Sequence, residues 1–462
     1  MHRNDKVQVL KTEYWSSQTT FLLATVSCSV GLGNLWRFPY IAGENGGGAF
    51  VLVYLGFVLF IGVPLVMAEL AIARRGRSSP VTTIALVAQS ESRTRAWQSI
   101  GWMSVLGPLL ALSFYAVVGG WSLDYLVKSA AADFSNASSA QAQQMFATLL
   151  DSPARMIASF SLMMVGVVFV VGSGLQRGIE KVATFMMPAL AVLLISLVVY
   201  ANIVGSSAQA WQFLFDADFS KLTSEAVLMA LGQSLFSIAI GTGALLAYGA
   251  YLPSYVSIPR AAWTIALADT AAALLAGLLI FPIVFASGLD VSEGPGLIFV
   301  TMPMAFANMP GAQLVGPLFF LLVFFAAFTS AIGMLEPFVS WAEEQSGLSR
   351  RKAASVTAAL VWLLGLAAVF SFNIWKEFTP LDMIPQLAGR TVFSILDYGV
   401  SNIVLPINAL LIALFAGWAI KGSNMRRDIG LESDYGWRMW QFSVRILAPV
   451  AVFSVFLFNL AG

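Results

Sequence analysis

Cysteine, histidine and charged residues are all scarce in this chain of 462 residues. Cys28 is the single cysteine, His2 is the single histidine, and only 11% of the residues are Asp, Glu, Lys or Arg. One cysteine excludes an internal disulfide, and one histidine in the N-terminal tail cannot complete a Cys-His dyad or a zinc site. A formal net charge of +1, with the basic residues spread over many segments, argues against a nucleic-acid partner.

Apolar residues are correspondingly abundant, at 58% of the chain with a mean hydropathy of +0.80. So few charges cannot cover a soluble surface of this size, and we expect an all-α polytopic membrane protein. Eleven apolar spans are long enough to cross a hydrocarbon core about 30 Å thick. They lie near residues 17–40, 49–73, 98–127, 157–175, 182–204, 226–252, 262–287, 316–342, 353–372, 392–420 and 438–460. The first, sixth and tenth spans are expected to be interrupted or bent.

The basic residues predict an orientation. With the N-terminus in the cytoplasm, 18 of the 25 lysines and arginines fall in inner segments and five in outer loops, while Arg37 and Arg445 lie within spans. This is the positive-inside pattern. We expect a multi-pass protein of the inner (plasma) membrane with a cytoplasmic N-terminus and an external C-terminus.

The first span contains residues that a lipid-facing helix does not need, namely Gly31, Gly33, Asn34 and Arg37. An unsatisfied backbone group in hydrocarbon costs several kcal/mol, so a helix broken here must line a wet cavity or bind a ligand. Close helix packing would explain the two glycines. It would not explain Asn34 and Arg37, so the stretch is a candidate site.

The sixth span repeats this break, with GTG at 241–243 corresponding to GLG at 31–33. Glycine-interrupted helices at matching positions of two halves are typical of transporters built from inverted repeats, which bind substrate and ions at the midplane. The sixth span comes five helices after the first, and because five is an odd number, the second half enters the membrane inverted. The expected units are a cytoplasmic tail (1–16), a first repeat (17–204), an outer connection (205–225), a second repeat (226–420), a cytoplasmic loop (421–437) and an eleventh span (438–462).

These motifs resemble those of the neurotransmitter:sodium symporter family, and the resemblance covers nearly the whole chain. Its signature is GLGNLWRFPY at 31–40 followed by ENGGGAF at 44–50, with further matches in SFY at 113–115, GQ at 232–233 and FTS at 328–330. The resemblance implies the leucine-transporter fold, with eleven transmembrane helices and a 5+5 inverted repeat. It also implies a sodium-coupled amino acid carrier that works by alternating access.

The resemblance further implies two sodium sites built from the hard oxygen ligands that unwound helices supply. Sodium site one would comprise the Ser29 carbonyl, Asn34, Ser237 and Asp269. Sodium site two would comprise the carbonyls of Ser27, Val30 and Ala326 and the hydroxyls of Thr329 and Ser330. The alternative for the two hydroxyls is hydrogen bonding to their own helix.

Asp269 stands where asparagine is the commonest residue of the family. A carboxylate deep in a span costs about 2.5–3.5 kcal/mol on insertion scales and is therefore a functional candidate, although a structural ion pair is the alternative. One turn later, Ala273 lacks both the serine hydroxyl of chloride-dependent members and the glutamate that replaces chloride in some bacterial ones. We expect no chloride dependence, with Asp269 supplying the negative charge.

For the substrate, the deciding position is Gly31, where monoamine carriers have an aspartate that meets the amine. Glycine leaves room for a substrate carboxylate, which Tyr115 would bind and Phe236 would cover, although an aromatic stripe is ordinarily core packing. The expected substrate site comprises Ser29, Gly31, Gly33, Ala111, Tyr115, Val118, Phe236, Ser237, Ala239, Thr242, Ser330 and Met334. It holds no charged residue, and Ala111 and Thr242 replace bulkier residues of the leucine transporter. A neutral, bulky hydrophobic or aromatic L-amino acid is predicted.

Gates are expected at both mouths of the site. Outside, Arg37 would face Asp397 and close the path through an intervening water, or the two would form a structural pair. Inside, Trp15, Tyr251 and Glu344 match gate positions, but Thr12 stands where the family has an arginine and Lys11 is adjacent.

Gly178 and Pro188, at the start of the fifth span, resemble a family motif where that helix unwinds to admit water. The alternative is a helix that simply begins after a glycine loop.

Four other classes of protein are alternatives to a sodium-coupled carrier, and one of them, a binding-only sensor, would bind the amino acid without transporting it. An enzyme is not expected, because the spans contain no histidine and no paired catalytic carboxylates. A channel fits the hydropathy but not the paired helix breaks. A proton-coupled or sodium-independent amino acid carrier of the same fold stays open. The expected partners are an amino acid, sodium ions and the lipid bilayer, and the sequence does not indicate the oligomeric state.

Overall fold

The computed structural model describes residues 13–134, 138–289, 296–307 and 309–461, and within these ranges the chain forms helices and no β-strand. Nine continuous helices in the described part are long and apolar enough to cross a membrane. They are Gly48–Gly76 (α3, η2, α4), Arg95–Ala130 (η3, α6), Pro153–Gly172 (α8), Leu175–Val204 (η4, α9), Ile258–Ala286 (α13), Ala312–Ser346 (α15), Arg350–Phe370 (α16), Val392–Ala419 (α17, η8, α18, η9) and Asp434–Phe458 (α20, η10, α21).

The remaining two expected spans are broken. In the first span, α1 (Gln18–Ser29) is followed by Gly33–Glu44 (η1 and α2) at a bend of 53°. In the sixth, α11 (Ser224–Ser237) and α12 (Ala244–Ala250) are separated by residues 238–243. The tenth expected span is instead one continuous helix that contains two π-helical segments, η8 (Gly399–Val404) and η9 (Phe415–Ala419).

The break in the sixth span has a local cause in its glycines. Gly241 and Gly243 adopt φ values of +77° and +76°, in the left-handed region that side chains disfavour. A Cβ on Gly243 would also collide with the carbonyl oxygen of Ser104 in α6. The helix therefore ends before Gly241 and restarts after Gly243.

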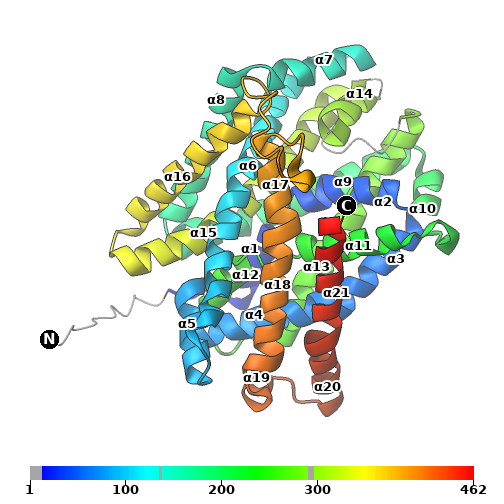
Figure 1. Cartoon of the computed structure of the whole chain (residues 1–462). Coiled ribbons are helices and arrows are strands. Elements are labelled where there is room, and N and C mark those ends of the chain that lie inside the picture. The colour runs from blue at the N-terminus through cyan, green and yellow to red at the C-terminus, as the bar shows by residue number, and fades with distance from the viewer. Residues whose placement is uncertain (1–12, 135–137, 290–295, 308, 462) are drawn as a thin grey trace.

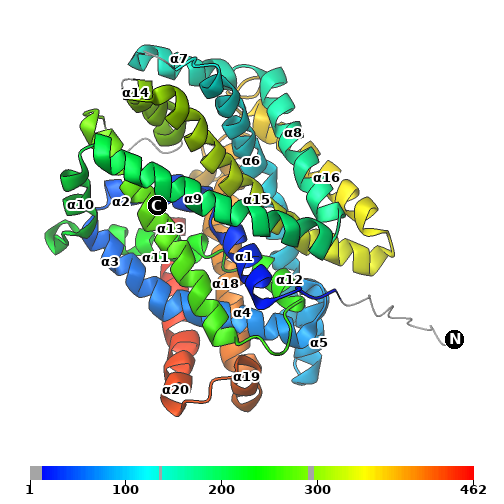
Figure 2. The same ribbon diagram turned by 180° about the vertical axis from the view of Figure 1, so that it is seen from behind.

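Short helices connect the spans at the two ends of the bundle. They are α5 (Pro80–Ser90), α7 (Ser139–Leu150), α10 (Ser207–Phe215), α14 (Met302–Ala307) and α19 (Gly422–Ile429). Figures 1 and 2 show α5, α19 and α20 at one end of the bundle and α7 and α14 at the other. Between these ends, α1 packs against α9, α13 and α15, and α12 packs against α4 and α15, so both broken spans contribute to the inside of the bundle.

Candidate functional site

The break in the sixth span is held by polar side chains from two other helices. The Gly241 N–H donates to the Glu69 carboxylate of α4 at 2.8 Å, and Asn408 Nδ2 of α18 (Leu405–Leu414) donates to the Gly241 carbonyl at 2.7 Å. Glu69 and Asn408 are fully buried. Backbone groups freed at membrane depth are thus satisfied. Our sequence reasoning missed both residues, although a carboxylate inside the apolar second span was a usable signal.

The break in the first span is held in the same way. Asn34 Oδ1 accepts from the Gly31 N–H at 3.0 Å, and the Tyr115 hydroxyl of α6 accepts from the Leu32 N–H at 3.2 Å. Gln233 Nε2 of α11 donates to the Gly33 carbonyl at 3.1 Å. The unwound backbone therefore lies between α6 and α11.

Three of the residues expected at sodium site one form a buried polar cluster. Asn34 Nδ2 donates to Asp269 Oδ1 at 2.9 Å and to Ser237 Oγ at 3.0 Å, and Ser237 Oγ donates to Asp269 Oδ2 at 2.5 Å. No lysine or arginine of the described residues lies within 4.0 Å of the Asp269 carboxylate. The structural ion pair weighed from the sequence is thus not formed. A buried carboxylate with only neutral donors has an uncompensated charge, which either a bound cation or a proton would neutralise.

The residues expected at sodium site two lie where α1 ends against α15. Val30 leaves the helix with φ −71° and ψ 94°, and Cys28 packs against Gly333. Thr329 Oγ1 donates to the Phe325 carbonyl at 2.9 Å. This is the hydrogen bond to its own helix that the sequence left open as the alternative to ion binding. The lone pairs of the Thr329 oxygen remain available to a cation. Ser330 Oγ is buried and has no hydrogen-bond partner among the described residues.

A cavity between α1, α6, α11, α15 and the tenth span brings together most of the expected substrate-site residues. Eleven of the twelve line it, and Val118 is buried away from it. Its walls also include six residues that sequence reasoning missed, which are Cys28, Pro108, Phe114, Val400, Ser401 and Leu405. The lining combines apolar side chains with hydroxyls and contains no charged residue.

The tenth span contributes an apolar wall to this cavity. Val400 and Leu405 form a small buried cluster with Ala111, against which Phe236 and Met334 pack. The π-helical turn η8 contains Val400 and ends directly before Leu405. Such residues look like ordinary lipid-facing positions in the sequence, and no motif marks them.

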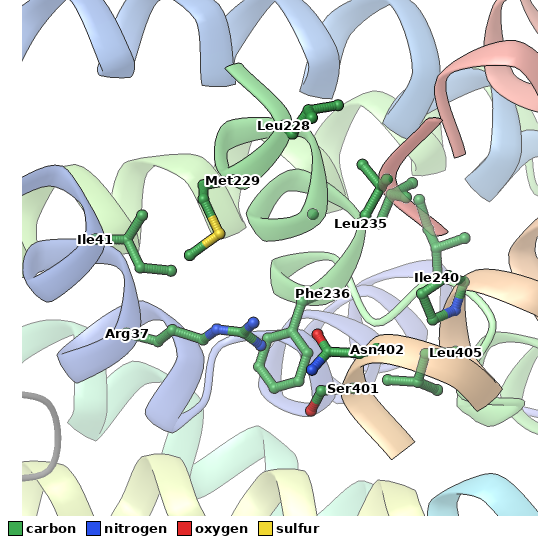
Figure 3. A pocket seen from close by; sticks show the side chains of 13 residues that line it. Arg37, Ile41, Leu228, Met229, Leu235, Phe236, Ile240, Ser401, Asn402 and Leu405 are labelled. Carbon is green, nitrogen blue, oxygen red and sulfur yellow. The ribbon is translucent and has the colours of Figure 1, made fainter. Parts of the chain in front are cut away.

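A second cavity has Arg37, Phe236 and Ser401 among its lining residues, as Figure 3 shows. Phe236, Ser401 and Leu405 line both cavities, so the two cavities adjoin at these side chains. The Arg37 guanidinium lies over this ring, 4.3 Å from its centroid. Asp397 is exposed, accepts from Ser401 Oγ at 3.2 Å and forms no direct ion pair with Arg37. A water-bridged pair between the two charges stays a prediction.

We expect Arg37→Ala to lower the initial rate of uptake into proteoliposomes, because the cation–π contact on Phe236 contributes about 0.5–2 kcal/mol. That range corresponds to a two- to about thirtyfold change in an equilibrium. Arg37→Lys keeps the charge and serves as the control. Asp397→Ala should also lower the rate if Arg37 pairs with this carboxylate in another conformation. Normal rates in both alanine variants would contradict a gating role for the pair.

At the other end, Trp15 is buried and its Nε1 donates to the Tyr248 carbonyl of α12 at 3.0 Å. The Tyr251 hydroxyl donates to Glu336 Oε1 at 3.1 Å, and Glu336 forms an ion pair with Arg350. Sequence reasoning missed Glu336 and Arg350.

Glu344, expected at the same inner gate, instead accepts from the Ser79 N–H at 3.0 Å and does not meet Tyr251. Lys11 and Thr12 lie outside the described residues. The inner contact is therefore made by Tyr251, Glu336 and Arg350.

Gly178 and Pro188 lie in one continuous helix, Leu175–Val204, whose first turn is the π-helical η4 (Leu175–Glu180). A Cβ on Gly178 would collide with the Val170 carbonyl oxygen. Close packing thus explains this glycine, and the fifth span is not unwound in this conformation.

Comparison with known proteins agrees with this geometry. The model of the sodium:neurotransmitter symporter family matches residues 12–145 and 141–462. The chain therefore belongs to this family, which is a family of transporters.

Individual relatives match over almost the full length. An uncharacterized sodium-dependent transporter of Bacillus subtilis, YhdH, is 36% identical over 98% of this chain and 98% of its own. The creatine transporter of Torpedo marmorata is 25% identical over 97% of this chain and 79% of its own. The crystal structure of MhsT in complex with L-phenylalanine superposes on this chain with a TM-score of 0.88 at 37% sequence identity. The match covers 96% of this chain and 99% of the MhsT chain. The chain thus has the fold of a leucine-transporter-type symporter.

Proposed function

We propose that the chain imports neutral, bulky hydrophobic or aromatic L-amino acids together with sodium. The observation that carries this proposal is the buried Asp269, Asn34 and Ser237 cluster, which lies beside an uncharged cavity lined by both broken helices. Sodium-dependent relatives support the coupling ion, and the phenylalanine complex of MhsT supports an aromatic substrate.

In this proposal, the substrate carboxylate lies against the broken first span. A Cβ on Gly31 would come within 2.9 Å of the Tyr115 hydroxyl and within 2.5 Å of Ser330 Oγ, so a side chain here would displace these two hydroxyls, and glycine brings no carboxylate of its own. Without it, the cavity has no anion to pair with the amine of a monoamine. The Tyr115 hydroxyl is positioned to donate to a carboxylate, because it already accepts from the Leu32 N–H.

Two sodium ions and independence from chloride belong to the same proposal. Ala273 is fully buried and offers no hydroxyl to an anion. The Asp269 carboxylate supplies the negative charge beside sodium site one that chloride would otherwise provide.

The proposal is tested by uptake of labelled phenylalanine into proteoliposomes under a sodium gradient, with a competition panel of common amino acids and monoamines. We expect bulky neutral amino acids to compete and dopamine and serotonin not to compete. Competition by monoamines alone would overturn the interpretation of Gly31. Uptake driven equally by a proton gradient without sodium would favour the proton-coupled carrier.

The size of the cavity is tested by Ala111→Val. Adding methyl groups to a packed site costs about 1–3 kcal/mol, so phenylalanine uptake should fall about tenfold while uptake of a smaller substrate such as alanine is spared. Val118→Leu adds volume on the same helix but outside the cavity. If Ala111→Val lowered the uptake of both substrates equally, this would contradict the assignment of Ala111 to the wall of the substrate site. A selective loss of phenylalanine uptake in Val118→Leu would contradict it as well.

A further inference from the structure

A group of basic residues lies where the tenth and eleventh spans meet the loop between them, far from the substrate cavity. The loop runs through α19 to α20 (Asp434–Phe442) at one end of the bundle (Figure 1). One cation of the loop, Arg426, already has partners. It donates to the Leu431 carbonyl at 3.0 Å and to the Glu432 carbonyl at 2.7 Å, and it forms an ion pair with Asp434 at 2.7 Å. Arg426 therefore shapes the loop.

Arg445 is different, because it lies within a span. Its Nε donates to the Gly417 carbonyl at 2.6 Å and its guanidinium lies 5.7 Å from the Trp418 ring centroid. No carboxylate of the described residues lies within 4.0 Å of it. The two Nη groups are thus left without an anionic partner.

One of these Nη groups lies at the start of α19. We call the residues there, Lys421, Gly422, Gln441 and Arg445, the corner. A Cβ built on Gly422 would lie 3.8 Å from Arg445 Nη2, 3.5 Å from Gln441 Nε2 and 3.5 Å from the Trp437 ring. The next residue toward the N-terminus, Lys421, is exposed and forms no ion pair in the described part of the chain. The corner therefore brings together a guanidinium and an amide donor, with an exposed lysine adjacent in the sequence.

The acidic residues nearby are already occupied. Glu91 pairs with Arg75 at 2.7 Å and accepts from the Lys421 N–H and from Asn424. Burial alone would raise the pKa of Glu91, but these hydrogen bonds lower it below its usual value. Asp428 pairs with Arg75 at 3.3 Å. Both carboxylates therefore already form ion pairs with Arg75, and neither forms one with Arg445 or Lys421.

The surface that leads away from the corner is apolar and exposed. Trp418, Phe442, Ile446 and Val450 have exposed fractions of 61%, 57%, 51% and 61%. In a chain that spans the membrane, such a surface faces acyl chains. A cation at its end must reach the interface or meet an anion.

We propose that this corner binds the phosphate of an anionic phospholipid through Arg445, Lys421 and Gln441, with the acyl chains lying along Trp418, Phe442 and Ile446. A guanidinium donates two parallel hydrogen bonds to a phosphate, and the ammonium adds a second charge. Basic pockets between transmembrane helices are typical sites for lipid head groups. The ligand class is fixed by the combination of cations with an adjoining apolar face.

The test is native mass spectrometry of the detergent-solubilised full chain, titrated with phosphatidylglycerol or with phosphatidylcholine of the same acyl chains. We expect one phosphatidylglycerol to bind preferentially. Each cation near an anionic head group contributes about fivefold to affinity, so Arg445→Gln with Lys421→Gln should weaken binding by about 25-fold. Arg445→Lys keeps the charge and should lose less.

The matched control is Arg390→Gln. Arg390 also bonds a carbonyl through Nε and lies over an aromatic ring, that of Tyr398, but in a different part of the molecule. We expect the Arg390→Gln variant to bind phosphatidylglycerol with the same affinity as the unmutated chain. An equal loss in this control, or wild-type affinity in the double variant, would overturn the proposal. Displacement of the lipid by millimolar inorganic phosphate would assign the corner to a soluble anion and would equally overturn it.

Discussion

Replacing Asp269 by asparagine is expected to remove most sodium-driven uptake at ordinary sodium concentrations. The variant keeps the shape of the side chain but removes a full negative charge from the cluster with Asn34 and Ser237. Two unit charges 4 Å apart interact by about 4 kcal/mol at an effective dielectric constant of 20. The apparent sodium affinity should therefore fall by about a hundredfold or more. The measurement is the sodium dependence of uptake into proteoliposomes.

The anion dependence of the same variants tests whether the carboxylate replaces chloride. Uptake by the unmutated chain should be equal in chloride and in gluconate. Adding Ala273→Ser to Asp269→Asn restores a hydroxyl one turn away, and the double variant should regain transport only when chloride is present. Chloride-dependent uptake by the unmutated chain would contradict this explanation of Asp269. Full activity of Asp269→Asn in gluconate would show that the charge is dispensable.

The second large effect is expected from Thr329→Ala combined with Ser330→Ala. Hydrogen bonds to charged groups contribute about 1.5–3 kcal/mol each, so the loss of two oxygen ligands should weaken sodium binding by about a hundredfold or more. Folding should be largely unaffected, because Thr329 bonds only its own helix and Ser330 has no partner among the described residues. Thermal unfolding and sodium-driven uptake together measure both effects.

Ser340→Ala is the control for that double variant. Ser340 lies in the same helix, is buried and donates to the Pro337 carbonyl at 3.0 Å, but it does not line the cavity. Its loss should leave uptake unchanged. Wild-type uptake by the double variant would remove Thr329 and Ser330 from the ion site. Unfolding of the double variant but not of Ser340→Ala would show that the two hydroxyls stabilise the helix.

The helix breaks could be predicted because they leave a local signal in the sequence. Glycine at 241 and 243 is required by a positive φ, and Asn34 has no purpose in a lipid-facing helix. Asp269 could be predicted because a carboxylate in an apolar span is costly. These positions carry chemistry that their neighbours in the sequence do not share.

The missed residues depend on tertiary packing, which no local pattern records. Val118 shares a helical face with Tyr115, yet it lies outside the cavity, whereas Val400 and Leu405 enter it from the tenth span. The tenth span, expected to be interrupted or bent, is not interrupted: Gly399 and Gly417 lie in π-helical turns and Pro406 in the α-helical segment between them, all within one continuous helix. At the inner end, Glu344 could not be told from Glu336, because only the packing of α12 against α15 decides which carboxylate Tyr251 reaches.

Gly241 is fixed in space by residues that belong to neither half of its own span. Glu69 holds its N–H from α4 and Asn408 holds its carbonyl from α18. These two hydrogen bonds tie the middle of the sixth span to the second and tenth spans. A tilt of α11 or α12 that keeps both bonds must therefore take place at the other residues of the break, 238–240 and 242–243.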